Sequence, residues 1–419
     1  MNNVVEEEVI NDIVEEVLVR LPVKALVRCK TLSKNWYNFI SYNKPFRERY
    51  LSINKGARSS LMLGFFFTKQ RININKVDGG GVRFFHTSDE GRSLLSKKRK
   101  RVCDGDDIAL PSPLHLPVYA QSLSFLGHRS VHIFGSSNGF LLCSPEQYYP
   151  KNYVICNPIT KQRVTLPIPE ATSEYVAHGF ICNASSSCFN SIQRYTVVRA
   201  ISPGPLESST SLTIELISSD SPNKWKLFVF NFPFAFYIAM PVVSNVVISE
   251  DGIMFLPILV EPKPDYALLV FDQHEQWSIM EFPPPKTKKF RCYHFGQSDG
   301  LLLYVMHEHE LQQLRIWVMD ISDGRRQWCL KHDIRLEITT KSCPELVECS
   351  DEELFDFEAF HPTDPRLIFI SIGEKMVLYD VSNSTLELLY DFSRKRWYTD
   401  YLMFPYMYGL IGRHLFFDA

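Results

Sequence analysis

The sequence has no excess of charge of either sign, and this absence limits the partners that suit the chain as a whole. Its 45 lysines and arginines nearly balance 47 aspartates and glutamates, so the formal net charge is −2. A dedicated nucleic-acid-binding protein usually carries a basic surplus. We therefore do not expect the whole chain to bind nucleic acid, and any interpretation based on charge must be local.

Signals of secretion and of oxidative folding are also absent. The first ten residues, MNNVVEEEVI, are acidic where a secretory signal is basic and then apolar. The ten cysteines are irregularly spaced, without any C-x-x-C pair, which favours reduced thiols over a disulfide framework or a zinc site. We therefore expect an intracellular protein.

Patterns of the common catalytic sites are missing as well. There is no G-x-S-x-G, no glycine-rich phosphate loop and no cysteine–histidine pair in a known catalytic context. The segment HEHE, His307 to Glu310, could suggest a metal site. It falls, however, between two apolar strands where a polar hairpin tip is expected, and no further ligand is placed by its spacing. We predict no catalytic residue, no metal and no cofactor.

The longest uncharged run, Leu227 to Ser249, approaches the length that spans a membrane. It is rich in aromatic and β-branched residues and contains Pro233 and Pro241. These features favour two buried strands divided at the prolines over a membrane helix.

The N-terminal residues show helical spacing. From Ile10 to about Tyr50 apolar residues recur every three or four positions, and Leu21-Pro22 predicts a corner between two helices, because proline suits a first helical turn. Ser33 is a candidate cap for a further helix whose inner face carries Trp36 and Ile40. The prediction is three short helices.

Beyond about residue 60 the pattern is that of short strands separated by turns. One unit recurs in four segments, and a fifth candidate runs from His178 past Ile214; the four are Ser136–Pro167, Ser249–Pro283, Gln297–Leu330 and His361–Tyr390. Repeats of roughly 40 to 50 residues predict the blades of a β-propeller, here six to eight of them. A β-sandwich is the alternative, but it does not need the recurring Asn-Gly and Asp-Gly strand openings. The fold class is therefore α+β and multidomain: a small three-helix domain followed by an all-β propeller-like domain.

Aspartates recur at the ends of three of these strands, at Asp272, Asp320 and Asp380. Paired carboxylates could indicate a glycosidase, but recurrence at equivalent positions favours turn residues that accept backbone N–H bonds.

One basic run interrupts a polar stretch and consists of Lys97, Lys98, Arg99, Lys100 and Arg101. It is similar to a short nuclear-import signal, and a solvated basic loop is an equally good interpretation. We therefore place the chain in the nucleus, the cytoplasm or both.

Two stretches together resemble a known family. VEEVLVRLPVKALVRCKTLSKNW and the KPF at residues 44–46 resemble the F-box, although Val9-Ile10 stands where that motif has Leu-Pro. Downstream, NGFLLC, CNPITKQRVTLP, YTVVRA, LLVFD, RIWVMD and VLYD resemble the associated domain, in order. The chain is thus similar to plant-type F-box proteins with a C-terminal kelch-like or WD-like β-propeller.

The resemblance implies a substrate receptor of an SCF-type cullin–RING ubiquitin ligase, which is not itself an enzyme. It implies an F-box domain at residues 1–50 and a propeller at 51–419 with a loop insertion at about 75–110. Helices of the F-box would bind a Skp-type adaptor, and the propeller would bind a protein substrate of unknown identity. We expect the adaptor-binding residues to be Val9, Ile10, Ile13, Val17, Leu18, Leu21, Pro22 and Leu26.

Two other functions remain open from the residues alone. A propeller-based hydrolase or oxidase would place carboxylates or metal ligands near the propeller axis. A nuclear regulatory protein without a ligase role would need the basic run for salt-dependent binding. The substrate-binding residues are unknown, and loop length points only to the segments around Tyr148, at Ser185–Asn190, at Pro203–Thr210 and at Pro262–Pro264.

Overall fold

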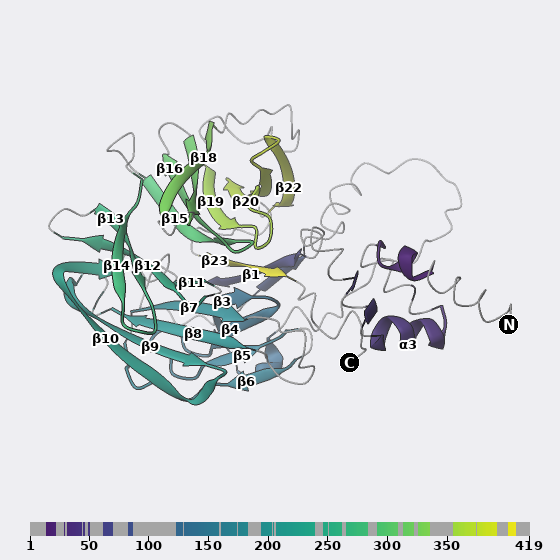
Figure 1. Cartoon of the computed structure of the whole chain (residues 1–419), viewed down its shortest axis with the longest axis horizontal. Coiled ribbons are helices and arrows are strands. Elements are labelled where there is room, and N and C mark those ends of the chain that lie inside the picture. Colours follow the sequence, from purple (N-terminus) through teal and green to yellow (C-terminus); the bar gives the residue numbers. More distant parts are fainter. Residues whose placement is uncertain are drawn as a thin grey trace.

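The computed structural model combines a small helical unit at the N-terminus with a large set of antiparallel sheets (Figure 1). It describes residues 14–21, 29, 32–43, 45–46, 49–50, 62–69, 83–86, 123–128, 130–158, 161–173, 175–182, 194–202, 204, 207–238, 246–249, 251–261, 265–283, 291–308, 313–321, 326–335, 355–373, 375–391 and 401–407. For 62–69, 83–86 and 401–407 the description covers the backbone only.

The helical unit follows the predicted pattern where it is described. Residues 14–18 are α-helical, and helix α3 runs from Lys34 to Tyr42. Ser33 caps α3 as predicted, because its hydroxyl oxygen accepts a hydrogen bond from the Trp36 N–H at 3.2 Å. Ile40 is fully buried, and Trp36 packs against the same apolar cluster.

A compact apolar cluster, which we call the N-terminal core, holds these helices together. It consists of Leu18, Val19, Ile40, Phe46 and Tyr50. The first helix ends in a tight turn at Leu21, whose N–H donates to the Leu18 carbonyl at 3.2 Å. The Tyr50 hydroxyl donates to the Leu21 carbonyl at 2.9 Å and so fixes the point where the chain turns. The helix thus ends where a corner is predicted, although Pro22 itself lies outside the described residues.

Three of the sheets have four strands in sequence order. The first contains β3 (His132–Ser137), β4 (Phe140–Ser144), β5 (Val154–Cys156) and β6 (Arg163–Thr165). The second contains β15 (Arg291–Ser298), β16 (Leu301–Glu308), β17 (Gln313–Asp320) and β18 (Gln327–Arg335). The third contains β19 (Phe355–Phe360), β20 (Leu367–Ile372), β21 (Lys375–Asp380) and β22 (Thr385–Asp391).

An eight-stranded sheet joins two further units of this kind. One unit contains β7 (Val176–Cys182), β8 (Tyr195–Ile201), β9 (Ser209–Ser218) and β10 (Ser221–Ile238). The other contains β11 (Val247–Ile248), β12 (Met254–Val260), β13 (Asp265–Phe271) and β14 (Trp277–Glu281). The end of β10 pairs with β12 and links the two units. Together these sheets account for the four predicted repeats and the fifth candidate.

The last sheet brings the two ends of the β-rich region together. Strand β1 (Met62–Lys69) lies between β2 (Arg83–His86) and β23 (Tyr401–Met407). Because β1 and β23 are more than 300 residues apart in sequence, their antiparallel pairing closes the β-rich region on itself. Strand β2 lies within the predicted loop insertion.

The first strand of each four-stranded unit contacts the first strand of a neighbouring unit or strand β23. Strand β7 contacts both β3 and β11, and β23 contacts both β19 and β3. Glycines permit this approach, because an added Cβ would lie 2.8 Å from Phe180 at Gly135, 2.7 Å from Val246 at Gly179 and 2.7 Å from Phe360 at Gly296. This radial packing of inner strands is consistent with the predicted propeller-like domain.

The turns that open the repeats have the predicted chemistry. Asn138 and Gly139 both have positive φ, +46° and +82°, between β3 and β4, and Asp299 and Gly300 repeat this at +48° and +78° between β15 and β16. Two residues with positive φ form the hairpin turn that matches strand twist, and Asn-Gly and Asp-Gly adopt it readily.

The long uncharged run forms strands, as predicted, but it is not divided at Pro233. Strand β10 continues through this proline as one strand of 18 residues. Its pairing shifts register between Asn231 and Phe236, so Pro233 lies where a ladder hydrogen bond is not needed. Among the described residues, no helix is long and apolar enough to cross a membrane.

Candidate protein-interaction sites

The helical unit exposes some of the predicted adaptor-binding residues and buries another. Val17 is 55% exposed, and Leu21 is half-buried at the end of the first helix. Leu18 is only 1% exposed and belongs to the N-terminal core, so it supports the surface from inside. Leu32, which the sequence patterns did not single out, is 67% exposed.

The remaining residues of that prediction lie outside the described part of the chain. They are Val9, Ile10, Ile13, Pro22 and Leu26. The basic run from Lys97 to Arg101 also lies outside it, as do the loop segments Ser185–Asn190 and Pro262–Pro264. Their predicted roles therefore stay predictions.

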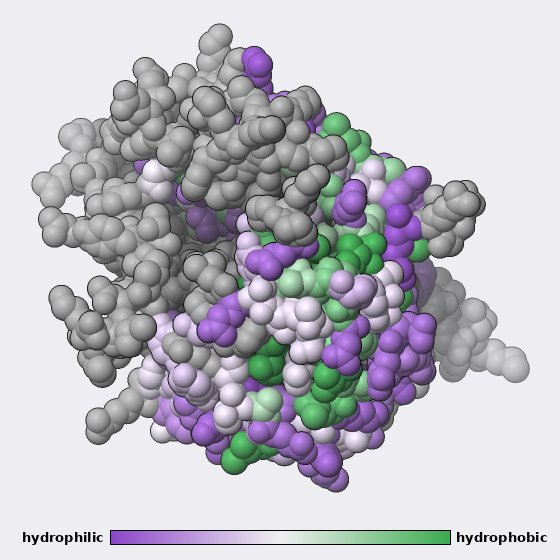
Figure 2. Space-filling view, turned by 90° about the vertical axis from the view of Figure 1, so that its left-hand side faces the viewer, coloured by the Kyte–Doolittle hydropathy of each residue, from purple (hydrophilic) through white to green (hydrophobic). Residues whose placement is uncertain are grey.

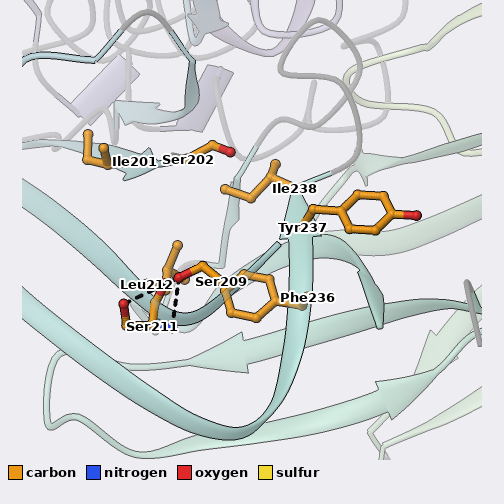
Figure 3. Close-up of a pocket in the computed structure, with 8 residues that line it drawn as sticks. All are labelled: Ile201, Ser202, Ser209, Ser211, Leu212, Phe236, Tyr237 and Ile238. Atoms are coloured by element: carbon orange, nitrogen blue, oxygen red, sulfur yellow. Dashed lines mark hydrogen bonds between the residues drawn. The ribbon is translucent and has the colours of Figure 1, made fainter. Parts of the chain in front are cut away.

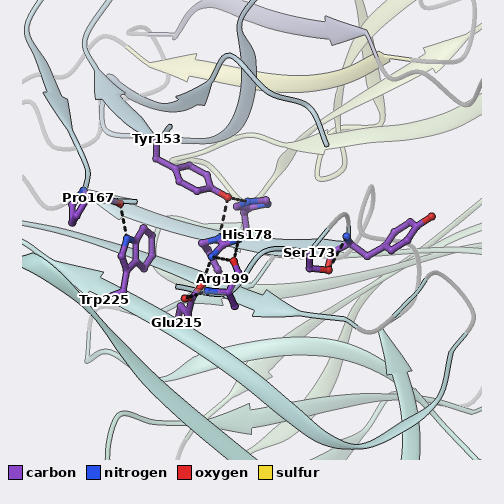
Figure 4. Close-up of polar contacts among 9 residues, drawn as sticks. Tyr153, Pro167, Ser173, His178, Arg199, Glu215 and Trp225 are labelled. Atoms are coloured by element: carbon purple, nitrogen blue, oxygen red, sulfur yellow. Dashed lines mark hydrogen bonds and ion pairs between the residues drawn. The ribbon is translucent and has the colours of Figure 1, made fainter. Parts of the chain in front are cut away.

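A buried polar network lies between the first two four-stranded units (Figure 4). Arg199 of β8 is fully buried and forms an ion pair with Glu215 of β9. Its Nε donates to the Tyr153 hydroxyl at 3.1 Å, and its two Nη atoms donate to the Ala171 carbonyl at 3.1 Å. The Ala171 N–H in turn donates to Glu215 Oε1 at 2.8 Å. Both charges are thus paired and hydrogen-bonded, as burial of an ion pair requires.

His178 completes this network and is held neutral. Its Nε2 lies 2.7 Å from the Tyr153 hydroxyl oxygen. Burial, with a smaller contribution from the Arg199 charge, lowers the pKa of His178 to about 3, and burial raises the pKa of Tyr153 above its usual value. Because the network is enclosed and its groups bond to one another, it clamps the segment between β6 and β7 onto β8 and β9.

The first half of the HEHE segment is strand and not the hairpin tip that the sequence predicts, and His309 and Glu310 lie outside the described residues. His307 and Glu308 are the last residues of β16, and each is only 1% exposed. Glu308 pairs with buried Arg315 of β17 at 2.7 Å. The prediction failed because the strand continues beyond its last apolar residue. Among the described residues, no group of three or more histidine, cysteine, aspartate or glutamate side chains could hold a metal ion.

Two of the three strand-end aspartates, Asp272 and Asp380, serve as turn residues, as predicted. Asp272 Oδ1 accepts the N–H groups of His274 and Gln276 at 2.8 and 3.0 Å. Asp380 Oδ1 accepts those of Ser382 and Asn383 at 2.9 and 3.1 Å. Asp320 likewise ends a strand, β17.

One shallow hollow lies where β10 leaves β9, between Ser209, Leu212 and Phe236 (Figure 3). It leaves no room for a water-sized molecule. Since a small-molecule site needs a cavity of several hundred Å³, this hollow does not qualify.

The loop around Tyr148 is held in one shape from inside. The Glu146 carboxylate accepts hydrogen bonds from the Ser144 hydroxyl at 2.6 Å and from the Asn152 amide at 2.5 Å, as well as from backbone N–H groups. Burial raises the pKa of Glu146, but these hydrogen bonds outweigh it and lower the pKa below its usual value. The loop thereby exposes Tyr148 and Tyr149, at 36% and 50%.

Comparison with known proteins accounts for both parts of the chain. A family model of the F-box domain matches residues 11–48. A second model, described as "F-box protein At3g26010-like, beta-propeller", matches residues 109–402, more than half of the chain.

Relatives from Arabidopsis thaliana carry the same name. F-box protein At5g07610 is 23% identical over 91% of this chain and 86% of its own length. F-box protein At2g21930 is 29% identical over 40% of this chain and 35% of its own, and the putative F-box/kelch-repeat protein At1g13200 is 51% identical over 11% of each. The chain therefore belongs to the F-box proteins that carry an At3g26010-like β-propeller.

Proposed function

We propose that this chain is the substrate-recognition subunit of an SCF-type ubiquitin ligase. One observation carries the proposal: a single chain contains an F-box and a β-propeller in succession. The F-box would bind a Skp-type adaptor and, through it, the cullin and the RING protein. The propeller would bind the protein to be ubiquitinated.

The adaptor would bind the exposed apolar side of the helical unit. Val17 and Leu21 are the described residues suited to direct contact, because their side chains reach the surface at the end of the first helix. We place Val9, Ile10, Ile13, Pro22 and Leu26 on the same surface from their helical spacing. Leu18 would act indirectly, since its burial in the N-terminal core positions its neighbours.

No catalytic residue is required of this chain. A receptor accelerates ubiquitin transfer by raising the local concentration of substrate lysines near a partner enzyme. The buried ion pair of Arg199 and Glu215 is closed off from solvent, which supports a structural and not a catalytic role for it.

We further propose six blades. Five are the four-stranded units, two of which share the eight-stranded sheet, and the sixth is the sheet of β1, β2 and β23. Pairing of an N-terminal strand with a C-terminal strand would close the ring without an open edge.

The basic run from Lys97 to Arg101 would direct part of the protein to the nucleus. A fluorescent fusion in which these five residues are replaced by alanine should be lost from the nucleus if the run is an import signal. Unchanged distribution of that fusion would contradict the nuclear proposal and leave the ligase proposal intact.

Co-purification of the tagged chain from plant cells under proteasome inhibition tests the ligase proposal. The wild type should retain the adaptor and the cullin, and Val17→Asp should lose both, because a carboxylate would be buried in an apolar interface. Leu32→Asp is the matched control, since it introduces the same charge at an exposed leucine outside the predicted surface. A wild-type chain that retains no adaptor would contradict the proposal.

A further inference from the structure

Strand β10 carries apolar side chains on both of its faces. The phenylalanine face is buried, whereas the other face buries Trp225 but exposes Leu227 and Val229. Alternate phenylalanines on one face, together with Trp277 of β14, form an aromatic ladder. Phe232 is its centre, with ring centroids 5.2 Å from Phe236 and 4.8 Å from Trp277. The phenylalanines of the ladder belong to or pack against the apolar cluster between β7 and β14, and Trp277 covers them from its exposed side. Burial in this cluster therefore accounts for the apolar residues on the phenylalanine face of β10.

The opposite face of β10 is not explained in this way. Leu227 and Val229 are 49% and 51% exposed. The cross-strand partner of exposed Val229 on β9 is Thr213, so the neighbouring strand carries a polar side chain where β10 carries an apolar one. An antiparallel strand with one solvated face normally alternates apolar and polar residues. The exposed apolar residues of β10 therefore depart from the expected pattern.

Among the described residues, one edge of the first half of strand β10 has no strand partner. From Ser221 to Asn231 its described partner is β9 alone, and pairing with β12 begins only at Phe236. At about 3.4 Å per residue, this edge is roughly 35 Å long. Such an edge presents a row of backbone N–H and C=O groups to which another strand can add.

The central part of this edge lacks the usual protection. The beginning of the edge is protected by a proline and two lysines, Pro222, Lys224 and Lys226, and Pro233 lies beyond its end. Residues 227–231 between them carry no charge. The comparable edge strand β18 carries Lys331, Asp333 and Arg335 along its length. Natural sheets use charge and proline to prevent unwanted strand addition. The absence of charge and proline over five residues of β10, between protected ends, indicates an edge that is available to another strand.

The surroundings of this edge favour an apolar segment with one acidic end. Lys226 is exposed, and Lys224 has only an exposed ion pair with Glu170 at 3.5 Å. Next to Pro167, whose carbonyl accepts the Trp225 indole N–H at 2.7 Å, Ile168 is 65% exposed and extends the apolar surface. Figure 2 shows the side of the molecule opposite the helical unit, where apolar patches alternate with hydrophilic ones.

We propose that residues 227–231 of β10 bind an extended segment of the protein substrate by strand addition. The segment would carry apolar side chains at alternate positions, which pack on Leu227 and Val229, and acidic residues at the end beside Lys226. Backbone hydrogen bonds would supply affinity, and the alternating side chains would supply selectivity. This proposal rests on the proposed receptor function and names the surface that the receptor uses.

Fluorescence anisotropy on the purified full chain, with whatever adaptor it retains, tests the proposal. The probe is a labelled peptide, Asp-Asp-Val-Thr-Val-Thr-Val-Asp-Asp, whose central five residues match the length of the open edge. A peptide of the same composition without alternation is the first control. Two derivatives, N-methylated on the valines or on the threonines, remove the N–H groups from one edge of the peptide or the other.

The alternating peptide should bind, the scrambled one should not, and only one N-methylated derivative should lose binding, because a strand pairs through one edge. Val229→Lys should weaken binding by at least about tenfold, whereas Leu330→Lys should change it by less than about twofold. Leu330 is a matched control because it is 49% exposed on edge strand β18. Val229→Thr keeps the β-branched shape and should weaken binding less, which guards against a misfolded lysine variant.

Three binding results would overturn the proposal: no binding of the alternating peptide, equal effects of Val229→Lys and Leu330→Lys, or equal effects of both N-methylated derivatives. A mass of two copies by light scattering, abolished by Val229→Lys, would assign the edge to self-association and also overturn it. Adaptor retained without peptide binding contradicts this inference alone. Peptide bound by a chain that retains no adaptor contradicts only the receptor function.

Discussion

The helical unit and the β-rich region differ in how much stabilising burial each obtains from its own residues. Among the described residues, the N-terminal core has five buried apolar residues, and Val17 remains exposed beside it. The β-rich region contains several larger apolar clusters and a buried ion pair with additional hydrogen bonds. It also has a sheet that joins its two ends. A unit of about fifty residues rarely gains enough stability from its own core. This difference is the one expected if, as we propose, an adaptor completes the helical unit.

Removal of the buried Arg199 side chain should have the largest effect on stability, and this effect should be confined to the β-rich region. Arg199→Ala leaves Glu215 buried without its partner, so we expect a loss of about 3–5 kcal/mol in the free energy of unfolding. Urea denaturation followed by tryptophan fluorescence measures this loss. The double variant Arg199→Met with Glu215→Leu removes both charges and should recover most of it. A single variant as stable as the wild type would show that the two regions do not differ in this way.

Acidification should weaken the same region. The pKa of His178 is lowered to about 3 in the folded chain, below the usual value of 6.5. As the pH falls from about 6.5 toward 3, the unfolded chain takes up the proton and the folded chain does not, so stability is lost over this window. His178→Gln should show a shallower fall in melting temperature between pH 7 and 5. His361, whose pKa is lowered by burial to about 4, should maintain part of the slope. Identical slopes for wild type and variant would refute the assignment to His178.

The smallest change should be confined to the helical unit. Tyr50→Phe removes the hydroxyl that donates to the Leu21 carbonyl at 2.9 Å. A hydrogen bond of this kind contributes about 0.5–1.5 kcal/mol, so adaptor affinity should fall by no more than about tenfold. The urea transition of the β-rich region should not move. If it moved as much as adaptor binding, the two regions would be coupled, and the contrast between them would fail.

Local signals in the sequence predicted most elements correctly. Asn138-Gly139 and Asp299-Gly300 mark hairpins because turn chemistry is set by the residues in the turn. Ser33 marks the start of α3 for the same reason. Asp272 marks a strand end because its carboxylate bonds to the N–H groups that follow it.

Features that depend on distant residues were not predictable. Arg199 and Glu215 each stand alone in an apolar strand, and only cross-strand register brings them together. A lone charge within an apolar run was the available signal, because buried charges need partners. Helical spacing also could not tell that Leu18 faces inward while Val17 faces outward, since neighbouring apolar stripes look alike until the helices pack.

A binding titration between the purified chain and a Skp-type adaptor tests the central claim most directly. The account predicts a saturable one-to-one complex that Val17→Asp weakens strongly and Leu32→Asp does not. A chain that shows the cooperative unfolding of its β-rich region and yet binds no adaptor would contradict the claim.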